Sequence, residues 1–255
     1  MARSSRPAGG SEDATAPAGG LPPRTPFRAD SDRERVPPQP APRRPSHRSA
    51  AVLLAARDPV LATLIEAAGP PTLRAPGGTP FAALTRSVTY QQLAGPAAAA
   101  IHGRLLAAMG DPDDPAALLG LPDEALRAAG LSRNKAESLR DLATKVLDGT
   151  VDLDRRHLAR ASDEEIVAHL STVRGIGEWT AQMCLMFQLR RLDVWPTGDL
   201  GVRRGYGLAW RVPPPTAREL GPLGDPFRPY RSVAAWYCWR ACELYAGAAD
   251  SAFTR

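Results

Sequence analysis

Two features of the sequence carry residue types that could do chemistry together, a glycine turn at residues 175–177 and an aspartate at position 199. Gly175-Ile176-Gly177 lies between two helix-like segments, and its two glycines allow a tight turn and close approach by another backbone. The N–H groups that begin the second helix would then point outward as an anion site. Asp199 precedes another helix start, where its carboxylate could stabilise developing positive charge. The pair predicts a phosphate-binding turn near a catalytic carboxylate.

Simpler interpretations of both features stay open. A Gly-x-Gly pair often provides only a turn between helices, and an aspartate in a loop is often the N-cap of the next helix. The surroundings of the turn favour a function, because Val173 precedes it, Ile176 can fill the space between the helices and Thr180 follows inside the second helix. Asp193 is the weaker catalytic candidate, since we expect it to end the preceding segment.

The elements that must position these residues are predicted to be helices. Apolar residues recur at helical spacing within residues 53–65, 81–88, 101–109, 139–146, 166–173 and 233–244. Ser162 followed by Glu165 is typical of a capping box at a helix start. No alternating strand pattern of useful length follows residue 51. We therefore expect an all-α fold built from many short helices.

The N-terminal part of the chain differs in composition from the rest. Residues 1–49 contain ten prolines, nine arginines and five acidic residues, with almost no large apolar side chains. Such a segment cannot bury enough surface to fold, so we predict disorder over residues 1–50 and order from about Ala51. The tail carries +4 of the net charge of +5. Because the remainder is nearly neutral, binding to nucleic acid would need a local patch and backbone amides.

The cysteines form an odd and sparse set of three, Cys184, Cys238 and Cys242. This set argues against a disulfide framework and for a reducing compartment. No run approaches the roughly 20 apolar residues of a membrane span, and the first residues lack the apolar region of a signal peptide. We expect a cytoplasmic protein, and the abundance of alanine, arginine and proline suggests a high-GC bacterial source.

The glycine turn and its surroundings resemble the helix-hairpin-helix DNA-binding motif, and Asp199 is placed like the essential aspartate of the helix-hairpin-helix DNA glycosylases. Residues 81–93 are similar to the early helix of that family and its turn into DNA, and residues 229–240 are similar to its C-terminal signature. The similarity spans roughly residues 52–246. Within the superfamily, the combination resembles the alkylation-repair enzymes of the DNA-3-methyladenine glycosylase II type.

The resemblance implies a fold and an activity. The fold would be a multi-helix, two-lobed helix-hairpin-helix glycosylase fold in residues 51–255, with the hairpin at about residues 163–190 and the active-site cleft between the lobes. The activity would be hydrolysis of the N-glycosidic bond of alkylated purines, of the 3-methyladenine and 7-methylguanine type, reached by base flipping. Asp199 would stabilise the oxocarbenium-like state or activate water. The partner would be double-stranded DNA containing alkylated bases, bound by a nucleoid-associated monomer.

The resemblance also assigns residues to the site. The flipped base would lie between Trp179, Tyr90 and Trp236, whose rings would attract a cationic base through cation–π contact. Gln92 and Leu93 would fill the gap that the base leaves, with Gln92 at the intercalating position. An ordinary helix end at Gln92 and Leu93, and a core position for Trp236, are the alternatives that stay open.

The hairpin itself would hold both DNA and a cation. The implied DNA contacts come from Arg174, Gly175, Ile176, Gly177 and Thr180. In the family, backbone carbonyls of the hairpin also bind a monovalent cation, Na⁺ or K⁺, that bridges to the phosphate. The matching positions in this chain are Ser171, Val173 and Ile176. Carbonyl ligands leave no side-chain signature, so the cation site rests on the resemblance alone.

The residues that are missing narrow the chemistry. Bifunctional relatives use a lysine that attacks C1′ and forms a Schiff base, just after the second hairpin glycine, where this chain has Glu178 and Trp179. The two lysines of the chain, Lys135 and Lys145, lie upstream, outside the hairpin region. We therefore expect a monofunctional hydrolase. An iron–sulfur cluster needs four cysteine thiolates, and no zinc spacing is present, so we expect neither cofactor.

Two alternative functions stay open. A helix-hairpin-helix protein that binds damaged DNA without cutting it would have no need of Asp199. A glycosylase for another modified base, such as an oxidised or mismatched purine, is disfavoured in its best-known forms, because the lysine and the cluster cysteines are missing.

Overall fold

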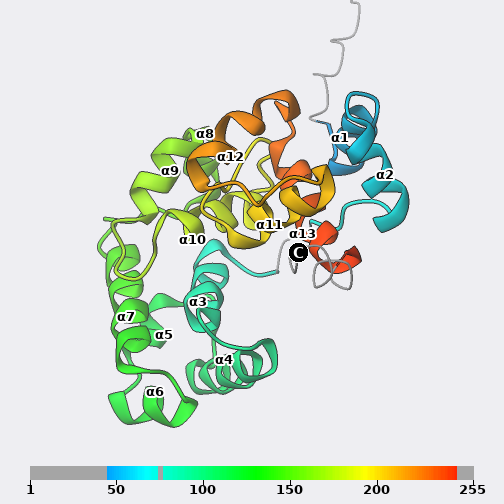
Figure 1. The fold of residues 1–255 in the computed structure, drawn as a ribbon. Helices are drawn as coiled ribbons and strands as arrows, with labels where there is room; N and C mark the ends of the chain where they lie inside the picture. Colours follow the sequence, from blue (N-terminus) through cyan, green and yellow to red (C-terminus); the bar gives the residue numbers. More distant parts are fainter. Residues whose placement is uncertain (1–44, 74–76, 246–255) are drawn as a thin grey trace, which may run out of the picture. The chain divides into compact units, whose positions relative to one another are not determined.

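The computed structural model describes residues 45–73 and 77–245, and every regular element within these ranges is helical (Figure 1). The first helices are α1 (His47–Ala55), α2 (Pro59–Ala68), α3 (Pro80–Tyr90), α4 (Gly95–Met109), α5 (Pro115–Leu119), α6 (Asp123–Ala129) and α7 (Arg133–Leu147). They are followed by α8 (Arg155–Arg160), α9 (Asp163–Leu170), α10 (Glu178–Met183), the π-helical turn η1 (Cys184–Gln188), α11 (Leu200–Trp210), α12 (Ala217–Leu223), the 3₁₀ turn η2 (Asp225–Phe227) and α13 (Arg231–Leu244). The prediction of an all-α fold is confirmed. None of these helices is both long enough and apolar enough to span a membrane.

Side chains that cap N-termini explain where several helices begin. Asp58 precedes α2, and its Oδ1 accepts hydrogen bonds from the N–H groups of Val60 and Leu61 at 2.8 and 2.9 Å. Ser162 and Glu165 form the predicted capping box of α9, in which each backbone N–H donates to the other residue's side chain. The N–H groups of a first turn have no partner inside the helix, so such caps stabilise that end.

Two helix boundaries differ from the sequence pattern. α1 begins at His47, before the predicted start of order, because Ser46 Oγ accepts a hydrogen bond from the N–H of Ser49 and caps the helix. α9 ends at Leu170 rather than near Val173, since the N–H of Val173 donates to the Leu170 carbonyl in a tighter turn. The predicted disorder of the N-terminal tail falls almost wholly outside the described residues and stays a prediction.

The helices pack in two sets that are joined through α10 and η1. In one set α1, α2, α11 and α13 contact one another; in the other, α3 contacts α4 and α7, and α5 and α6 pack on α7 (Figure 1). α10 packs on α9 and continues into η1, which packs on α3. Phe187 of η1 also stacks on Trp239 of α13. The predicted division into two lobes with a cleft between them stays a prediction.

The close approach of α11 to α13 depends on a glycine. A Cβ at Gly205 of α11 would overlap the carbonyl group of Cys238 on α13. Both residues are buried, and Cys238 is fully so. α11 begins just after Asp199, and α13 carries Trp239, so this contact sets how far the aspartate lies from that tryptophan.

Substitution Gly205→Ala is expected to destabilise the protein by about 1–3 kcal/mol, because the added methyl group overpacks a contact between two backbones. The measurement is the midpoint and slope of urea unfolding. Gly103→Ala on α4 is the matched control, since a Cβ there meets no atom within 4 Å. That change should stabilise the helix by about 0.5–1 kcal/mol. Equal effects of the two substitutions would contradict the packing account.

Candidate active site

Asp199 is held in place by three N–H donors. Its Oδ1 accepts hydrogen bonds from the N–H of Val202 at 2.7 Å and from Trp239 Nε1 at 2.9 Å. Its Oδ2 accepts a hydrogen bond from Trp179 Nε1 at 2.6 Å. The residue is 9% exposed, and among residues 45–73 and 77–245 no Lys, Arg or His forms an ion pair with it. Neutral donors therefore orient a negative charge that no side-chain cation of these two ranges pairs with.

Local backbone structure brings Asp199 to this position. Asp199 is the N-cap of α11, as the simpler interpretation of the sequence expected, and its own N–H donates to the Pro196 carbonyl at 3.0 Å. Trp195 anchors the loop before Asp199, because its Nε1 donates a hydrogen bond to the Leu220 carbonyl at 2.9 Å. The next residue but one is Gly201, where a Cβ would lie 2.8 Å from Trp239 Cδ1. The missing side chain leaves room for the Trp239 indole beside the first turn of α11.

Two tryptophan side chains contact the carboxylate, and one of them stacks on a phenylalanine that lines a cavity. The rings of Trp239 and Phe187 stack with centroids 5.9 Å apart and planes 18° from parallel. A cavity of about 240 Å³ opens beside Phe187, and Met183 and Cys184 line it from α10 and η1. Trp179, one helical turn before Met183, is 46% exposed although its indole reaches Asp199. This arrangement offers a flat ligand an aromatic surface next to a carboxylate.

The hairpin between α9 and α10 has the geometry expected of a backbone anion site. Ile176 is 2% exposed and fills the space between the two helices. Gly175 has φ of 75°, and a Cβ there would overlap the hydroxyl of Ser138 on α7. Gly177 is the N-cap of α10. Within the described residues the N–H groups of Gly177, Glu178 and Trp179 have no acceptor, so they are available to a phosphate.

Known proteins are similar to this chain over the region that contains the hairpin and Asp199. Residues 85–221 match the HhH-GPD superfamily of base excision DNA repair proteins. DNA-3-methyladenine glycosylase 1 of Schizosaccharomyces pombe is 35% identical over 168 residues, which make up 65% of this chain and 73% of that protein. The chain belongs to the HhH-GPD superfamily.

Two solved structures of HhH-GPD proteins have the same fold. The 3-methyladenine DNA glycosylase of S. pombe in complex with abasic DNA has a TM-score of 0.69 and 32% identity, covering 76% of this chain and 97% of that one. A DNA-3-methyladenine glycosidase of Bacillus halodurans has a TM-score of 0.70 and 36% identity, covering 78% and 91%. The helix-hairpin-helix glycosylase fold is therefore confirmed for this chain.

The aromatic residues of this HhH-GPD site differ in part from those predicted. Trp179 lies against Asp199 as expected of a pocket wall. Trp236 instead packs edge-on against Tyr237, with the Arg240 guanidinium 5.7 Å from its ring. Trp239, three residues further along α13, makes the contact with Asp199. The sequence signature contained both tryptophans, but helical spacing alone did not tell which of them faces the aspartate.

Tyr90 lies at the end of α3 and is covered by a cation. The Arg86 guanidinium carbon lies 4.0 Å from the centroid of its ring, and His102 of α4 packs edge-on at 5.9 Å. No hydrogen bond or ring contact among the described residues connects Tyr90 to Asp199. The structure therefore brings Trp179 to the aspartate but does not bring Tyr90 there, and the role of Tyr90 as a pocket wall stays a prediction.

Among the predicted DNA contacts of the hairpin, some residues are exposed and others are buried and support the turn from inside. The backbone of Gly175 and Gly177 forms the turn, while Ile176 supports it from inside. Arg174 is exposed, but its guanidinium pairs with Glu137 at 2.6 Å. Thr180 is 4% exposed, so its side chain is directed into the protein and supports the hairpin from within.

Gln92 and Leu93 lie in the short connection between α3 and α4. Gln92 has φ of 57°, an uncommon conformation for a residue other than glycine, and its side chain is exposed. Leu93 is 38% exposed. Both side chains are therefore available to enter a DNA duplex, as the predicted plug requires.

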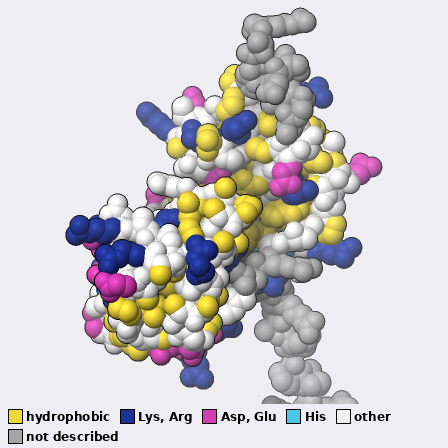
Figure 2. Space-filling model, turned by 90° about the horizontal axis from the view of Figure 1, so that it is seen from below, with side chains coloured by type: hydrophobic (Ala, Val, Ile, Leu, Met, Phe, Trp, Pro, Cys, Tyr) yellow, Lys and Arg dark blue, Asp and Glu magenta, His cyan; other side chains and the backbone are white. Residues whose placement is uncertain are grey.

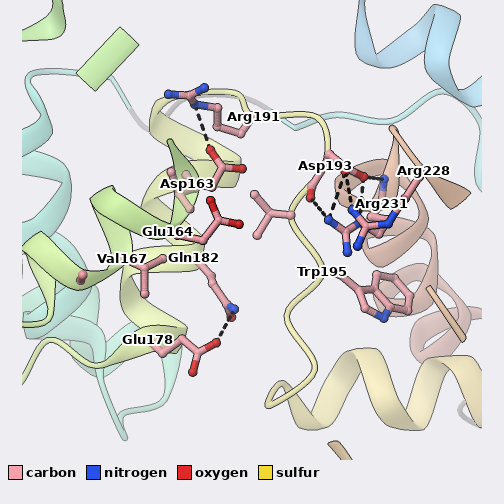
Figure 3. Close-up of a pocket in the computed structure, with 13 residues that line it drawn as sticks. Asp163, Glu164, Val167, Glu178, Gln182, Arg191, Asp193, Trp195, Arg228 and Arg231 are labelled. Carbon is pink, nitrogen blue, oxygen red and sulfur yellow. Dashed lines mark hydrogen bonds and ion pairs between the residues drawn. The ribbon is translucent and has the colours of Figure 1, made fainter. Parts of the chain in front are cut away.

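Asp193 has a structural role that is visible in Figure 3. Its carboxylate points toward two arginines, accepting from Arg231 Nε at 2.8 Å and from Arg228 Nη1 at 3.1 Å. These residues line a cavity of about 640 Å³ whose other side carries Glu164 and Glu178 (Figure 3). Because Asp193 is neutralised by two guanidinium groups, it is the weaker catalytic candidate, as expected.

Both lysines contact segments that are predicted to bind DNA, and Lys145 lies against the hairpin, which corrects its placement outside the hairpin region. Lys145 Nζ donates to the Thr172 carbonyl at the base of the hairpin, at 2.6 Å. Lys135 Nζ donates to the carbonyls of Thr89 and Gln91, just before the predicted plug, at 2.7 Å each. The sequence separation hid these contacts, which depend on how α7 packs.

Two of the three cysteines are buried, and at least one of the candidate cation ligands is able to bind an ion. Burial raises the pKa of Cys184 to about 12 and also raises that of Cys238, while Cys242 Sγ donates to the Gly201 carbonyl at 3.3 Å. Among the described residues no three His, Cys, Asp or Glu side chains gather as metal ligands. The Val173 carbonyl accepts from the N–H of Ile176 and retains a second lone pair, so it can still bind a cation.

Charge on the surface is dispersed. The face seen in Figure 2 shows hydrophobic side chains interleaved with scattered Lys and Arg side chains and a few acidic ones. Attraction of DNA to this face would therefore be local, which fits the nearly neutral charge expected for the helical region.

Asp141 of α7 links hairpin stability to pH. It accepts hydrogen bonds from Lys145 Nζ at 2.9 Å and from the N–H of Arg174 at 2.7 Å. Burial raises the pKa of Asp141, but these two hydrogen bonds and the positive charges of Lys145 and Arg174 together outweigh it and leave the pKa below its ordinary value. A carboxyl whose pKa is lowered by folding stabilises the protein above its unfolded pKa, and this contribution is lost as pH falls through the folded pKa.

Substitution Asp141→Asn is therefore expected to lower the free energy of unfolding at pH 7, with a difference from wild type that shrinks as pH falls below about 4. Urea unfolding at a series of pH values measures this difference. Asp148→Asn is the control, because Asp148 is a carboxylate at the end of the same helix and its substitution leaves both hairpin bonds in place. A difference for Asp141→Asn that is independent of pH would show that the ionised carboxylate does not stabilise the hairpin.

Proposed function

We propose that the protein is a monofunctional DNA glycosylase that hydrolyses the N-glycosidic bond of alkylated purines in duplex DNA. The observation that carries the proposal is the Asp199 carboxylate, which is held by three N–H donors, has no paired cation among the described residues and lies against Trp179 and Trp239. Membership of a base excision DNA repair superfamily gives the substrate class, DNA with an altered base.

Cleavage begins with loss of the base. As the bond between C1′ and the base nitrogen breaks, its electron pair goes to the base and positive charge builds on the deoxyribose. The Asp199 carboxylate stabilises this charge by Coulomb attraction in a site from which water is largely excluded. A water molecule then adds to C1′ and loses its proton, which leaves an abasic sugar and a free base.

Asp199 is better suited to stabilise charge than to accept a proton. Both of its oxygens already accept hydrogen bonds, one from Trp179 and the other from Trp239 and the Val202 N–H. The catalytic contribution we assign to Asp199 is therefore mainly electrostatic, with water orientation as a secondary role.

The aromatic surface suits a cationic base. Alkylation at a ring nitrogen makes a purine positively charged, so it is both a good leaving group and a partner for indole and phenyl faces. Trp179 is exposed, and Trp239 stacks on Phe187 beside a cavity. The names of several relatives, DNA-3-methyladenine glycosylase among them, support alkylated purines. The type II assignment is supported by one relative, DNA-3-methyladenine glycosylase 2 of Escherichia coli.

The monofunctional assignment is supported by two observations. The position where bifunctional relatives have a lysine is occupied by Trp179, whose indole nitrogen donates to Asp199. The ammonium groups of Lys135 and Lys145 are each bound to backbone carbonyls of other segments. An amine that is protonated and held in this way is not available to attack C1′.

Binding to DNA would use the hairpin and the plug. The free N–H groups of Gly177 and its successors would hold a phosphate, with a Na⁺ or K⁺ on the carbonyls of Ser171, Val173 and Ile176. These are neutral oxygen ligands of the kind that suits such ions. Gln92 and Leu93 would occupy the gap in the base stack. We further propose that the protein acts as a monomer in the bacterial cytoplasm, at the nucleoid.

The proposal predicts a joint effect of residue and lesion. Wild-type protein should release 7-methylguanine from duplex DNA faster than the neutral lesion hypoxanthine, and Asp199→Asn should lower release of 7-methylguanine by about 10²-fold or more, since it removes the stabilising charge. Single-turnover release of free base measures both effects. Asn keeps one acceptor oxygen that can cap α11, but its NH2 group would face an indole N–H, so thermal unfolding is measured to show that the variant is folded.

Three results would contradict parts of this proposal. Normal turnover by Asp199→Asn would remove the aspartate from the mechanism. Equal release of charged and neutral lesions would remove the preference for cationic bases. Strand cleavage at abasic sites without added base or heat, together with a protein–DNA adduct trapped by borohydride, would show a Schiff base and a bifunctional enzyme. Asp193→Asn is the control, because Asp193 is a carboxylate of the same region that pairs with two arginines.

A further inference from the structure

One face of α7 contacts both of the elements that would bind DNA. Lys135, Ser138, Asp141 and Lys145 follow one another at helical spacing on this helix. Lys135 reaches the end of α3, Ser138 lies against Gly175, and Asp141 and Lys145 bind the hairpin at Arg174 and Thr172. A single rigid helix therefore fixes the connection that carries the plug and the hairpin that would hold the phosphate.

The contact of Lys135 is unusual for a surface lysine. Its half-buried ammonium group donates to two carbonyls at the C-terminal end of α3, those of Thr89 and Gln91, at 2.7 Å each. The last carbonyls of a helix have no partner inside it, and a cation placed there also interacts favourably with the helix dipole. Burial lowers the pKa of Lys135. When its acceptors move away, such a partly desolvated ammonium group loses more favourable free energy than an exposed one does.

Gln91 connects the C-terminal end of α3 to the hairpin. Its side-chain Nε2 donates to the Gly175 carbonyl at 2.9 Å and lies 3.4 Å from Thr180 Oγ1. Thr180 is buried, so it is a fixed partner. The position of the plug is therefore tied to the hairpin twice, once directly through Gln91 and once through Lys135 and α7.

The residues between these contacts are weakly held by their own backbone. The N–H of Gln91 donates to Val88 at 3.4 Å and that of Leu93 to Tyr90 at 3.3 Å, both long distances. Ala94 precedes α4 without a side-chain cap, and Gln92 occupies the left-handed region. A connection with so few bonds of its own needs outside contacts to hold one conformation.

Composition also sets Lys135 and Lys145 apart. The chain has 32 basic residues, of which only these two are lysine, and both donate to backbone carbonyls next to the predicted DNA contacts. A compact ammonium group can direct its donors to carbonyls that converge on one point, whereas the planar guanidinium of arginine has a fixed fork. Lysine is thus the residue type that this geometry requires.

We propose that Lys135 and Gln91 are positioning residues for base flipping, which hold the plug Gln92-Leu93 at a fixed place relative to the hairpin. The inference rests on the proposed function and deepens it. Neither residue touches the reacting atoms. Their contribution is to keep the plug preorganised, so that closing the gap in the base stack does not require ordering of the connection at that moment.

The test compares one lesion in two contexts. Single-turnover release of 7-methylguanine is measured when the lesion is paired with cytosine and when it faces a stable abasic-site analogue, where leaving the stack costs less. Lys135→Met should slow release from the paired duplex by at least about tenfold, the change that corresponds to about 1.4 kcal/mol. It should slow release opposite the abasic analogue by about twofold or less. Gln91→Leu should shift the ratio of the two rates in the same direction.

Lys145→Met is the matched control. It removes the other lysine of α7, which binds the hairpin and not the plug connection. It should weaken DNA binding in both contexts and leave the ratio of the two rates unchanged. If Lys135→Met lowered the rate of base release equally in both contexts, or did not lower it, the proposal would be overturned. If Lys135→Met shows no cooperative unfolding transition, the ratio for Gln91→Leu decides.

A second measurement separates this proposal from the proposed function. 2-Aminopurine is placed opposite thymine in a fully paired duplex, and its fluorescence rises when a bound protein unstacks it. Wild type and Lys145→Met should raise the fluorescence at saturation, and Lys135→Met and Gln91→Leu should raise it less. If wild type releases no base, the glycosylase proposal fails while this signal still decides the positioning role. Equal fluorescence for all four proteins would overturn the positioning role.

Discussion

The hydrogen bonds that fix the Asp199 carboxylate are the interaction on which the rest of the site depends. Three donors reach it from three segments, the first turn of α11, the start of α10 and the middle of α13. A buried carboxylate that lacks a cation is costly unless its oxygens are satisfied by hydrogen bonds. Two indole groups and one backbone N–H supply them without removing its negative charge. The packing of α11 on α13 at Gly205 is what allows this geometry.

A second constraint concerns the binding of a duplex, which must be held and opened together. Gripping a phosphate with the hairpin is useful for catalysis only if the flipped base then lies beside Asp199. In this chain the start of α10 would serve both proposed needs, because Gly177 is the N-cap of the helix and Trp179 two residues later donates to the aspartate. The proposed phosphate site and the proposed catalytic carboxylate are thus connected by half a helical turn. α7 supports the same hairpin from behind and reaches the plug connection through Lys135.

Much of this arrangement could be predicted from the sequence. The glycine hairpin, the buried Ile176, the capping box of α9 and the placement of Asp199 all follow from local patterns, and the structure confirms the hairpin geometry and the N-cap position of Asp199. The role of Trp239 could not be predicted, because Trp236 and Trp239 share one helix and only its packing decides which of them faces α11. The carbonyl contacts of the two lysines could not be predicted for a related reason, since their partners lie 27 to 46 residues away in sequence. Local rules therefore gave the chemistry, while tertiary packing gave its supports.

The most direct test of the central claim uses the charge of the bound sugar and not the rate of the reaction. Duplex DNA is prepared with a pyrrolidine in place of the target nucleotide, which mimics the positive charge of the transition state, and with a neutral tetrahydrofuran of the same shape. Affinities of wild type and Asp199→Asn for both duplexes are measured at the same salt concentration. The account predicts that wild type binds the cationic analogue at least about tenfold more tightly than the neutral one, and that Asp199→Asn abolishes the preference. A preference that survives in Asp199→Asn, or that is missing in wild type, would contradict the role of Asp199 as the stabilising charge.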